Sequence, residues 1–390
     1  MRTVYIIGVG MTKFGRFPES NVIELGRTAA LNALRDAGID KKDIQVAYAG
    51  HARTGQLYNR ECGVGQSILW ELGISGIPIS SVGNFCSSGS TALREAWMAV
   101  GTGMYDVAFA IGVEKLTGRA GKGRPLTSDG VELLTVMGFS PPIYFGNVVT
   151  RHMEEYGTTP EQLAMVAVKN RKNAGPNPRC QYREPITVEE VINSPLIVEH
   201  LNLLNCCPTT DGSAAAILCS KEVVSKYTSK PIEIAASALR SGPYKKCKDI
   251  TTFGSDRLAA SDAYETAGIG PEDIDFAEVH DCFTIAEIIH YEDFGFCKKG
   301  EGGRFVEEGM ADMGGKIPVS PSGGLMSRGH PIGATGLAQV AEAVWQLRGV
   351  AENQVEGAKV AFTHCAGGFQ DTIELGDVQS SAVTILKRGW

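Results

Sequence analysis

The stretch Ser81–Gly103 places a cysteine where it would be reactive. Cys86 is followed by the small hydroxyl residues Ser87 and Ser88, and apolar residues then recur at positions 92, 93, 96 and 100. This spacing is typical of a helix, so Cys86 is predicted to lie just before a helix N-terminus. There the free amides and the helix dipole favour a thiolate over the thiol. We therefore expect a nucleophilic cysteine, the alternative being a buried cysteine that packs as a small hydrophobe.

Three further clusters carry reactive side chains, and each lies where a strand ends or a helix begins. They are Val279–Thr284, which follows a strand and contains His280 and Cys282; Ser322–Gly336, a glycine-rich loop with His330; and Thr363–Phe369, a predicted tight turn with Cys365 and Gly367. In α/β folds, sites gather at strand ends and helix starts. The four clusters are thus candidates for one site.

An internal repeat indicates how the clusters meet. The segment 33–47 reappears at 263–277, and each copy reads as a helix end, a glycine C-cap, a turn and a strand. The helix and strand after Cys86 also correspond to the helix 337–347 and the strand 360–363. The repeat predicts two α/β halves of one topology, with sheets covered by helices on both faces.

Composition shifts suggest the domain boundaries. We expect an N-terminal half, an inserted cover and a C-terminal half, over residues 1–116 with 209–230, 117–208, and 231–390 respectively. The insertion carries Gly, Pro and Arg clusters interleaved with helical segments such as 160–173. Insertions of this size usually have a function, so this one is expected to roof a substrate pocket.

The joint placement of the clusters indicates the chemistry. Cys86 and His330 occupy related helix starts in the two halves, so a pseudo-two-fold arrangement would bring them together. A cysteine with a histidine base is a nucleophile for acyl groups. A second cysteine beside it can move a proton to or from the carbon next to a thioester carbonyl. This combination favours carbon–carbon chemistry on acyl thioesters over peptide hydrolysis.

Composition excludes several other classes. The 390 residues are 43% hydrophobic, which is enough for a large core. The net charge of −7 does not indicate binding to nucleic acid or to an anionic membrane. No apolar run reaches the roughly 18 residues of a membrane span, and no secretory signal is recognised, so a cytoplasmic protein is expected. The ten cysteines include no C-x-x-C pair. We expect free thiols and no metal site.

At this point the chain resembles the thiolases, in particular the sterol-carrier-protein type and its archaeal and bacterial relatives. Asn84–Gly89 is similar to the nucleophile motif N-x-x-C-x-S-G with one spacer residue fewer, and Gly329–Gly336 matches G-H-P-x-G-A-T-G. His280–Phe283 is similar to the H-D-C-F signature. The resemblance runs from Val4 to about residue 385. It implies a five-layer α-β-α-β-α thiolase fold with an inserted loop domain, in a homodimer or a dimer of dimers.

The resemblance also implies roles for the site residues. Cys86 would be acylated by an acyl-CoA, and His330 would activate it and help to bind the thioester oxygen. Backbone amides near Cys86 and Gly367 would form an oxyanion hole, while His280 would position a water in a second one. Coenzyme A would be substrate or product, with no tightly bound cofactor. Candidate substrate contacts are Ser320, Gly323 and Gly324 near the glycine-rich loop, and Met137 and Phe139 in the segment 133–145.

The acid/base cysteine is where the chain departs from the family pattern. Most thiolases use the cysteine of C-x-G, whereas the sterol-carrier type has His-Asn-x-Gly there and uses the cysteine of H-D-C-F. This chain has both, as Cys365 and Cys282. We favour Cys282 because its motif is intact, and Cys365 stays the alternative.

The resemblance implies several alternatives for the substrate and for the direction of the reaction. Thiolytic cleavage of a 3-ketoacyl-CoA, including a bulky, branched or aromatic one, is favoured because Cys365 departs from the archaeal synthetic pattern. Acetoacetyl-CoA formation is the alternative, and in that branch the resemblance implies a small zinc-ribbon/OB-fold partner. A ketoacyl synthase pairs its cysteine differently, and a non-catalytic lipid carrier should have lost Cys86 or His330, which are both present.

Overall fold

The computed structural model describes residues 1–58, 62–118, 137–242, 249–369 and 377–390. The N-terminal strands and helices are β1 (Val4–Met11), α1 (Val22–Ala37), β2 (Val46–Gly50), α2 (Thr54–Tyr58), α3 (Val64–Glu71), β3 (Ile79–Val82), α4 (Ser88–Gly101), β4 (Val107–Glu114) and, after the insertion, β7 (Gly212–Ser220). The C-terminal elements are β8 (Ile232–Ser241), α9 (Gly254–Ala267), β9 (Phe276–Glu278), α10 (Thr284–Asp293), α11 (Gly302–Glu307), α12 (Gly324–Ser327), α13 (Thr335–Arg348), β10 (Val360–Phe369) and β11 (Val378–Arg388).

The predicted repeat is confirmed strand by strand. In the first half β2 runs parallel to β4, and β4 is antiparallel to β7; in the second half β9 and β10, then β10 and β11, repeat these directions. The helices α1 and α9 end at Gly38 and Gly268, both in the left-handed region with φ of 61° and 64°. Glycine is the residue that adopts this conformation at little cost, so both repeats stop their helix by the same means.

The strands of the two halves form two β layers that are joined edge to edge into one hydrogen-bonded sheet. Within the described residues nine strands are joined in the order β3-β2-β4-β7-β1-β8-β11-β10-β9. The junction is short, because β1 and β8 pair only through Tyr5 with Glu233 and Ile6 with Ile232. The half-sheets are therefore continuous at a narrow seam, which the repeat does not predict.

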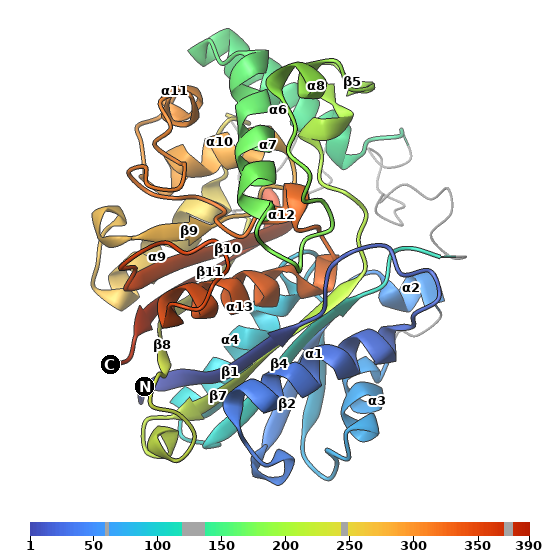
Figure 1. The fold of residues 1–390 in the computed structure, drawn as a ribbon, viewed down its shortest axis with the longest axis vertical. Helices are drawn as coiled ribbons and strands as arrows, with labels where there is room; N and C mark the ends of the chain where they lie inside the picture. Colours follow the sequence, from blue (N-terminus) through green and yellow to red (C-terminus); the bar gives the residue numbers. More distant parts are fainter. Residues whose placement is uncertain (59–61, 119–136, 243–248, 370–376) are drawn as a thin grey trace.

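Helices separate and cover the half-sheets in five layers (Figure 1). α1 and α3 cover the outer face of the N-terminal half-sheet, and α9 and α10 lie on the outer side of the C-terminal one. α4 and α13 pack against each other in the central layer, where Leu93 of α4 and Leu337 of α13 share a buried core with residues of both half-sheets. The predicted α-β-α-β-α order is confirmed, and it places the starts of α4 and α13 together.

The described part of the insertion forms helices above the C-terminal half (Figure 1). They are α6 (Pro141–Tyr156), α7 (Pro160–Ala174) and α8 (Val188–Ile192), followed by a hairpin of β5 (Leu196–Val198) and β6 (Leu201–Asn202). α7 packs on α10, α11 and α12, which follow the H-D-C-F segment or belong to the glycine-rich loop. The insertion thus contacts the elements that carry the site, while the proposed domain boundaries stay a prediction.

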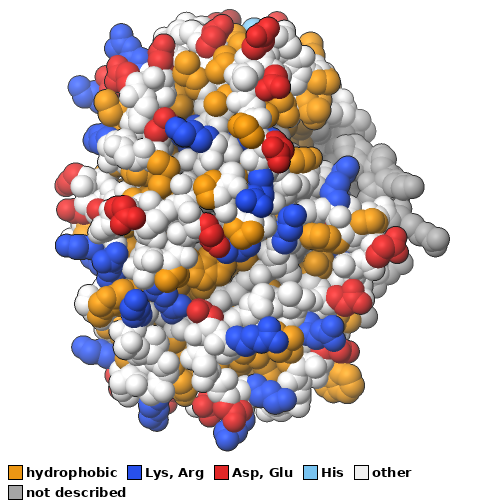
Figure 2. All heavy atoms as spheres, viewed as in Figure 1, with side chains coloured by type: hydrophobic (Ala, Val, Ile, Leu, Met, Phe, Trp, Pro, Cys, Tyr) orange, Lys and Arg blue, Asp and Glu red, His pale blue; other side chains and the backbone are white. Residues whose placement is uncertain are grey.

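The face of the molecule drawn in Figure 2 carries mixed charges. On the face in Figure 2, Lys and Arg side chains alternate with Asp and Glu, and no continuous basic stripe crosses it. A search of the described helices finds none with the length and apolar character that crossing a bilayer requires.

Candidate active site

Cys86 lies on a sharp turn between β3 and α4. Phe85, the residue before it, has φ of 49°, a left-handed conformation that costs a non-glycine residue on the order of 1 kcal/mol or more. The Ser88 side chain braces this turn, since its hydroxyl accepts from the Asn84 amide at 2.9 Å and donates to the Phe85 carbonyl at 2.6 Å. The turn places Cys86, a residue of intermediate exposure, directly before the first turn of α4, as the sequence predicts.

His330 reaches Cys86 from the loop before α13. Its Nε2 lies 3.3 Å from the Cys86 Sγ, and its Nδ1 lies 2.7 Å from the Thr335 hydroxyl. That hydroxyl donates to the Pro331 carbonyl at 3.1 Å, so it accepts from Nδ1–H. This hydrogen-bond network assigns the tautomer with Nε2 unprotonated, facing the thiol. His330 is therefore oriented as a base for Cys86.

The thiolate expected at the helix start is wrong for the resting protein. Burial raises the pKa of the Cys86 thiol to about 12, and the charge of Glu114 adds to the rise. Burial, helped by the charge of Arg328, lowers the pKa of His330 to about 3. Desolvation disfavours both charged forms, and it outweighs the helix dipole. The pair rests as a neutral thiol and a neutral imidazole.

This neutral pair predicts the pH dependence of acylation. Because His330 is unprotonated above about pH 3 and Cys86 is protonated below about pH 12, neither group changes state near neutrality. The second-order rate of Cys86 acylation by an acyl-CoA, measured by stopped-flow or quenched mass spectrometry, should be flat from about pH 5 to 8. An inflection between pH 6 and 7 that disappears in His330→Gln would instead show a thiolate–imidazolium pair.

Cys365 and Gly367 approach the other side of the Cys86 turn. They lie within β10 rather than on a turn after it, so the predicted strand end is wrong: pairing with β11 continues to Phe369. The Cys365 thiol donates to the Cys86 carbonyl at 2.9 Å. A Cβ built on Gly367 would lie 2.5 Å from the Cys86 amide nitrogen. The β10 backbone thus comes as close to Cys86 as a glycine permits.

Gly367→Ala is expected to displace the Cys86 turn. The added methyl would overlap the Cys86 amide, and such overpacking costs typically about 1–3 kcal/mol of stability. Because the resemblance implies that the Cys86 amide is an oxyanion donor, displacing it is expected to lower kcat by about 10²–10³-fold. Gly83→Ala is the matched control, because a Cβ there would meet only the His51 carbonyl oxygen, at 3.7 Å. Thermal unfolding and acyl-transfer rates of the two variants test this, and equal effects would contradict it.

His280 and Cys282 complete the group around Cys86. The His280 ring lies 5.1 Å from the His330 ring, and its Nδ1 is 3.5 Å from the Cys365 Sγ. Burial lowers the pKa of His280 well below its usual range, and neighbouring imidazoles lower it further. Cys282 is buried beside Cys207, whose amide donates to the Cys282 carbonyl at 2.9 Å. Burial raises the pKa of the Cys282 thiol, and the nearby Cys207 and Cys86 add to the rise.

The glycine-rich loop is fixed by Asp281. This buried carboxylate accepts from the amides of Leu325 and Met326 at the start of α12, at 2.7 and 3.2 Å, and burial raises its pKa to about 7. A Cβ on Gly324 would lie 2.2 Å from the Asp281 Oδ2, and one on Gly323 would lie 2.6 Å from the Ala174 Cβ. Both glycines therefore pack tightly between the H-D-C-F segment and α7.

The remaining predicted substrate contacts lie in different environments. Ser320 is buried with φ of 54°, and its hydroxyl has no partner among the described residues. Phe139 packs edge-on to Tyr144 beside the C-terminal core. Met137 is 72% exposed, and residues 133–136 of the same segment lie outside the described residues. Contact of these side chains with substrate stays a prediction.

Comparison with known proteins decides the family. A model described as the thiolase N-terminal domain matches residues 4–222, and one described as thiolase C-terminal domain-like matches residues 236–386. The chain belongs to the thiolase family. It is thus an acyltransferase, and the order of the two matched domains agrees with the two halves of the fold.

Relatives of this thiolase cover nearly its whole length. It is 44% identical over 376 residues to an acetyl-CoA acetyltransferase of Methanothermobacter thermautotrophicus, covering 95% of this chain and 98% of the relative. It is 43% identical over 373 residues to the benzoylsuccinyl-CoA thiolase subunit BbsB of Thauera aromatica, covering 94% and 95%. Among solved structures, the Ltp2-ChsH2(DUF35) aldolase matches with a TM-score of 0.84 at 26% identity, covering 99% of this thiolase and 98% of that chain.

Two residues that position the thiolase site were missed by sequence reasoning. Glu114, at the end of β4, accepts from the amides of residues 52 to 54 and, at 3.0 Å, from the amide of Gly333. Thr210 accepts from the His330 amide at 3.1 Å. The signal for Glu114 is an acidic residue that ends a buried apolar strand, since such a carboxylate needs partners.

Metal donors also gather in this thiolase, although the sequence predicts no metal site. In the described part of the chain, Cys86, His280 and His330 have donor atoms within 4.8 Å of one another, and so have Asp256, His290 and His364. The first group is the candidate active site. Its thiol and imidazoles would bind a soft cation, which would compete with acylation.

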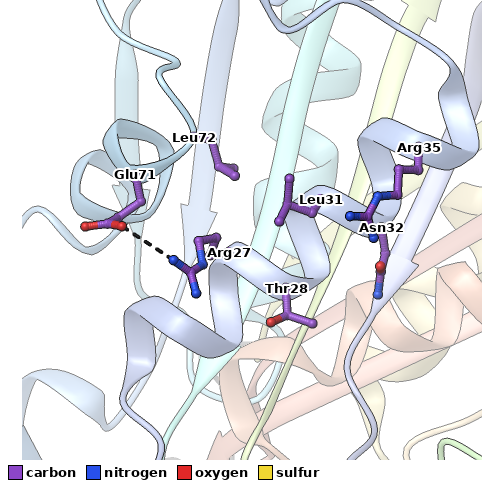
Figure 3. Close-up of a pocket in the computed structure, with 7 residues that line it drawn as sticks. All are labelled: Arg27, Thr28, Leu31, Asn32, Arg35, Glu71 and Leu72. Atoms are coloured by element: carbon purple, nitrogen blue, oxygen red, sulfur yellow. Dashed lines mark ion pairs between the residues drawn. The ribbon is translucent and has the colours of Figure 1, made fainter.

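A surface cavity of about 490 Å³ lies on the opposite face of the N-terminal half-sheet from α4. It is lined by α1 and α3 residues, and Arg27 and Glu71 form an ion pair of 3.7 Å across it (Figure 3). The other lining residues are Thr28, Leu31, Asn32, Arg35 and Leu72. These include no cysteine or histidine, and α1 and α3 lie on the side of the half-sheet away from α4.

Proposed function

We propose that this thiolase cleaves a 3-ketoacyl-CoA with coenzyme A through an acyl-enzyme on Cys86. The observation that carries the proposal is the 3.3 Å contact between the Cys86 Sγ and the unprotonated Nε2 of His330, with further thiols beside it. A cysteine–histidine pair alone would serve hydrolysis equally well. The additional thiols supply the proton transfer at carbon that C–C chemistry requires.

In the first half-reaction His330 takes the Cys86 proton as the sulfur attacks the 3-keto carbon. The bond between C2 and C3 then breaks, the acyl group stays on Cys86, and Cys282 protonates C2 to release the CoA thioester that carries C1 and C2. In the second half-reaction, the Cys282 thiolate takes the proton of coenzyme A. The coenzyme A sulfur then accepts the acyl group from Cys86, which forms the shortened acyl-CoA. His330 returns its proton to Cys86. Amides of Cys86 and Gly367 would stabilise one oxyanion, and a water held by His280 would stabilise the other.

We assign the proton at C2 to Cys282 and a positioning role to Cys365. The Cys365 thiol already donates to the Cys86 carbonyl at 2.9 Å, so its proton holds the nucleophile turn on β10. For the Cys282 thiol the structure gives no hydrogen bond to the described residues, which leaves it available to substrate. This agrees with the intact H-D-C-F signature.

For the substrate we favour a bulky or aromatic 3-ketoacyl-CoA. The similarity to a benzoylsuccinyl-CoA thiolase subunit supports this choice. Acetoacetyl-CoA formation is the second candidate, supported by the similarity to an archaeal acetyl-CoA acetyltransferase. The test is incubation of the protein with coenzyme A and a panel of acetoacetyl-, medium-chain, branched and aroylsuccinyl-CoA substrates, with products identified by mass. A kcat/KM at least tenfold higher for the aroyl substrate supports our choice, whereas turnover of acetoacetyl-CoA alone overturns it.

We also propose an assembly of two or more copies, with a separate acyl-CoA-binding partner. The strand β3 ends the sheet within the described residues and exposes Ser80 and Ser81, so its edge could pair with a second copy. The similarity to a protein called a thiolase subunit, and to one solved with a DUF35 component, supports a partner. Light scattering of the purified chain alone tests the assembly of two or more copies. Light scattering of the chain co-expressed with the products of neighbouring genes tests the partner.

A further inference from the structure

A second group of chemically capable side chains lies inside the C-terminal half. Asp256 is in the first turn of α9, His290 is near the end of α10, and His364 is in β10. The Asp256 Oδ2 is 3.1 Å from the His290 Nε2, and its Oδ1 is 3.2 Å from the His364 Nε2. All three side chains are at most 2% exposed. The reaction at Cys86 uses none of them.

Several polar atoms of this group have no hydrogen-bond partner among the described residues. They are the Asp256 Oδ1, both ring nitrogens of His364 and the His290 Nδ1. The Asp256 Oδ1 and the His364 Nε2 are close enough for a hydrogen bond but are not aligned for one. The Asp256 Oδ1 and the His364 Nε2 are therefore placed so that both can contact one ion between them. Buried polar groups in native proteins nearly always have a partner, so this concentration needs an explanation.

The surroundings of the group are apolar and aromatic. The His290 ring stacks on the Phe294 ring at 5.2 Å and 10°, and Phe294 also meets the His364 ring edge-on at 4.7 Å. The Phe253 ring also packs against the His290 ring, at 5.9 Å between centroids. A carboxylate in such an environment is costly unless it is paired or binds a metal, and the rings hold both imidazoles in fixed orientations.

We propose that Asp256, His290 and His364 bind a structural divalent transition-metal ion of the Zn²⁺ class. Two imidazoles and one carboxylate are ligands that Zn²⁺ prefers, with bonds of about 2.0–2.2 Å in a tetrahedron. Donors on such a tetrahedron are separated by about 3.3 Å; the Asp256 Oδ2 and the His290 Nε2 are 3.1 Å apart, and one donor atom from each of the three residues lies within 4.8 Å of the others. A water would take the fourth position. The ion would tie α9 and α10 to β10, the strand that carries Cys365 and Gly367.

The test uses the full-length Cys86→Ala variant, because the thiol of Cys86 belongs to the other donor group. The protein is treated with a chelator and dialysed, and Zn²⁺ binding is measured by metal analysis and calorimetry. We expect about one equivalent to bind and saturating Zn²⁺ to raise Tm by about 2–4 °C. Co²⁺ in its place should give the visible bands of a tetrahedral nitrogen and oxygen site without thiolate charge transfer. Less than a tenth of an equivalent bound, or no such spectrum, overturns the proposal.

Variants then locate the ion. Asp256→Asn and His290→Gln, each in the Cys86→Ala background, should lose the bound equivalent and the rise in Tm. His152→Gln is the matched control, since His152 is an equally buried histidine that bonds to Thr158 and Glu292 instead. Retention of the equivalent in both test variants overturns the proposal. Should a variant fail to fold, the Co²⁺ spectrum of the Cys86→Ala protein decides alone. None of these readouts depends on turnover, so the inference is independent of the proposed reaction.

Discussion

Cys86→Ala is expected to lower kcat by about 10⁴-fold or more and to abolish the acyl-enzyme. The reason is that the 3.3 Å contact with His330 would have no nucleophile to activate, and a base without its nucleophile leaves only binding and oxyanion stabilisation. Intact-protein mass spectrometry after mixing with an acyl-CoA measures the adduct directly. Steady-state release of the shortened acyl-CoA measures turnover.

Cys219→Ala is the control for this variant. Cys219 is a fully buried free cysteine in β7, paired in the sheet with Tyr5 of β1 and Val107 of β4, and no role in the chemistry is assigned to it. The control should keep the acyl adduct, although removing its sulfur will lower Tm. An adduct of unchanged mass and rate in Cys86→Ala would move the nucleophile to another thiol. Peptide mapping of the adduct would then identify it.

Cys282→Ser and Cys365→Ser are expected to separate the two steps. Cys282→Ser should still accept an acyl group from an acyl-CoA onto Cys86 but lose thiolysis by about 10²–10⁴-fold, the usual contribution of a general acid or base. Cys365→Ser can still donate to the Cys86 carbonyl through its hydroxyl, so both steps should fall by similar, smaller factors. Hydrogen–deuterium exchange at C2 of an acyl-CoA, followed by mass spectrometry, reports the proton transfer without C–C cleavage.

The two serine variants serve as each other's controls, because each replaces one thiol near Cys86 by an oxygen. Loss of C2 exchange in Cys365→Ser, together with its retention in Cys282→Ser, would reverse the assignment. Loss in both would mean that the two thiols act together. In that case the double variant should be no slower than the worse single variant.

Much of the fold follows from patterns that a single sequence carries. The repeated helix, glycine and turn at 33–47 and 263–277 predict two halves of one topology, because each segment uses the same local chemistry. The prediction that Cys86 and His330 meet follows from this symmetry, and their contact bears it out. The order of layers follows as well, since apolar strands need helices on both faces.

The wrong predictions, a thiolate at Cys86 and a turn at residues 367 and 368, share one cause. Burial and strand pairing depend on segments that are far away in the sequence. The helix start at Cys86 favours a thiolate, but the desolvation that raises its pKa comes from packing that no local pattern reveals. Glycines at 367 and 368 suggest a turn, yet β11 continues the pairing through them. The role of Glu114 is visible only in the folded protein, where the Gly333 amide in the loop of the other half donates to it.

Glu114 has one more consequence, which concerns how the two halves depend on each other. Its carboxylate accepts from the Ala52 amide in the loop after β2 and from the Gly333 amide in the opposite half, so the loop that carries His330 is held by the half that carries Cys86. A C-terminal half expressed alone would lack the carboxylate that holds this loop. A rotation of one half against the other would therefore move the imidazole away from the thiol.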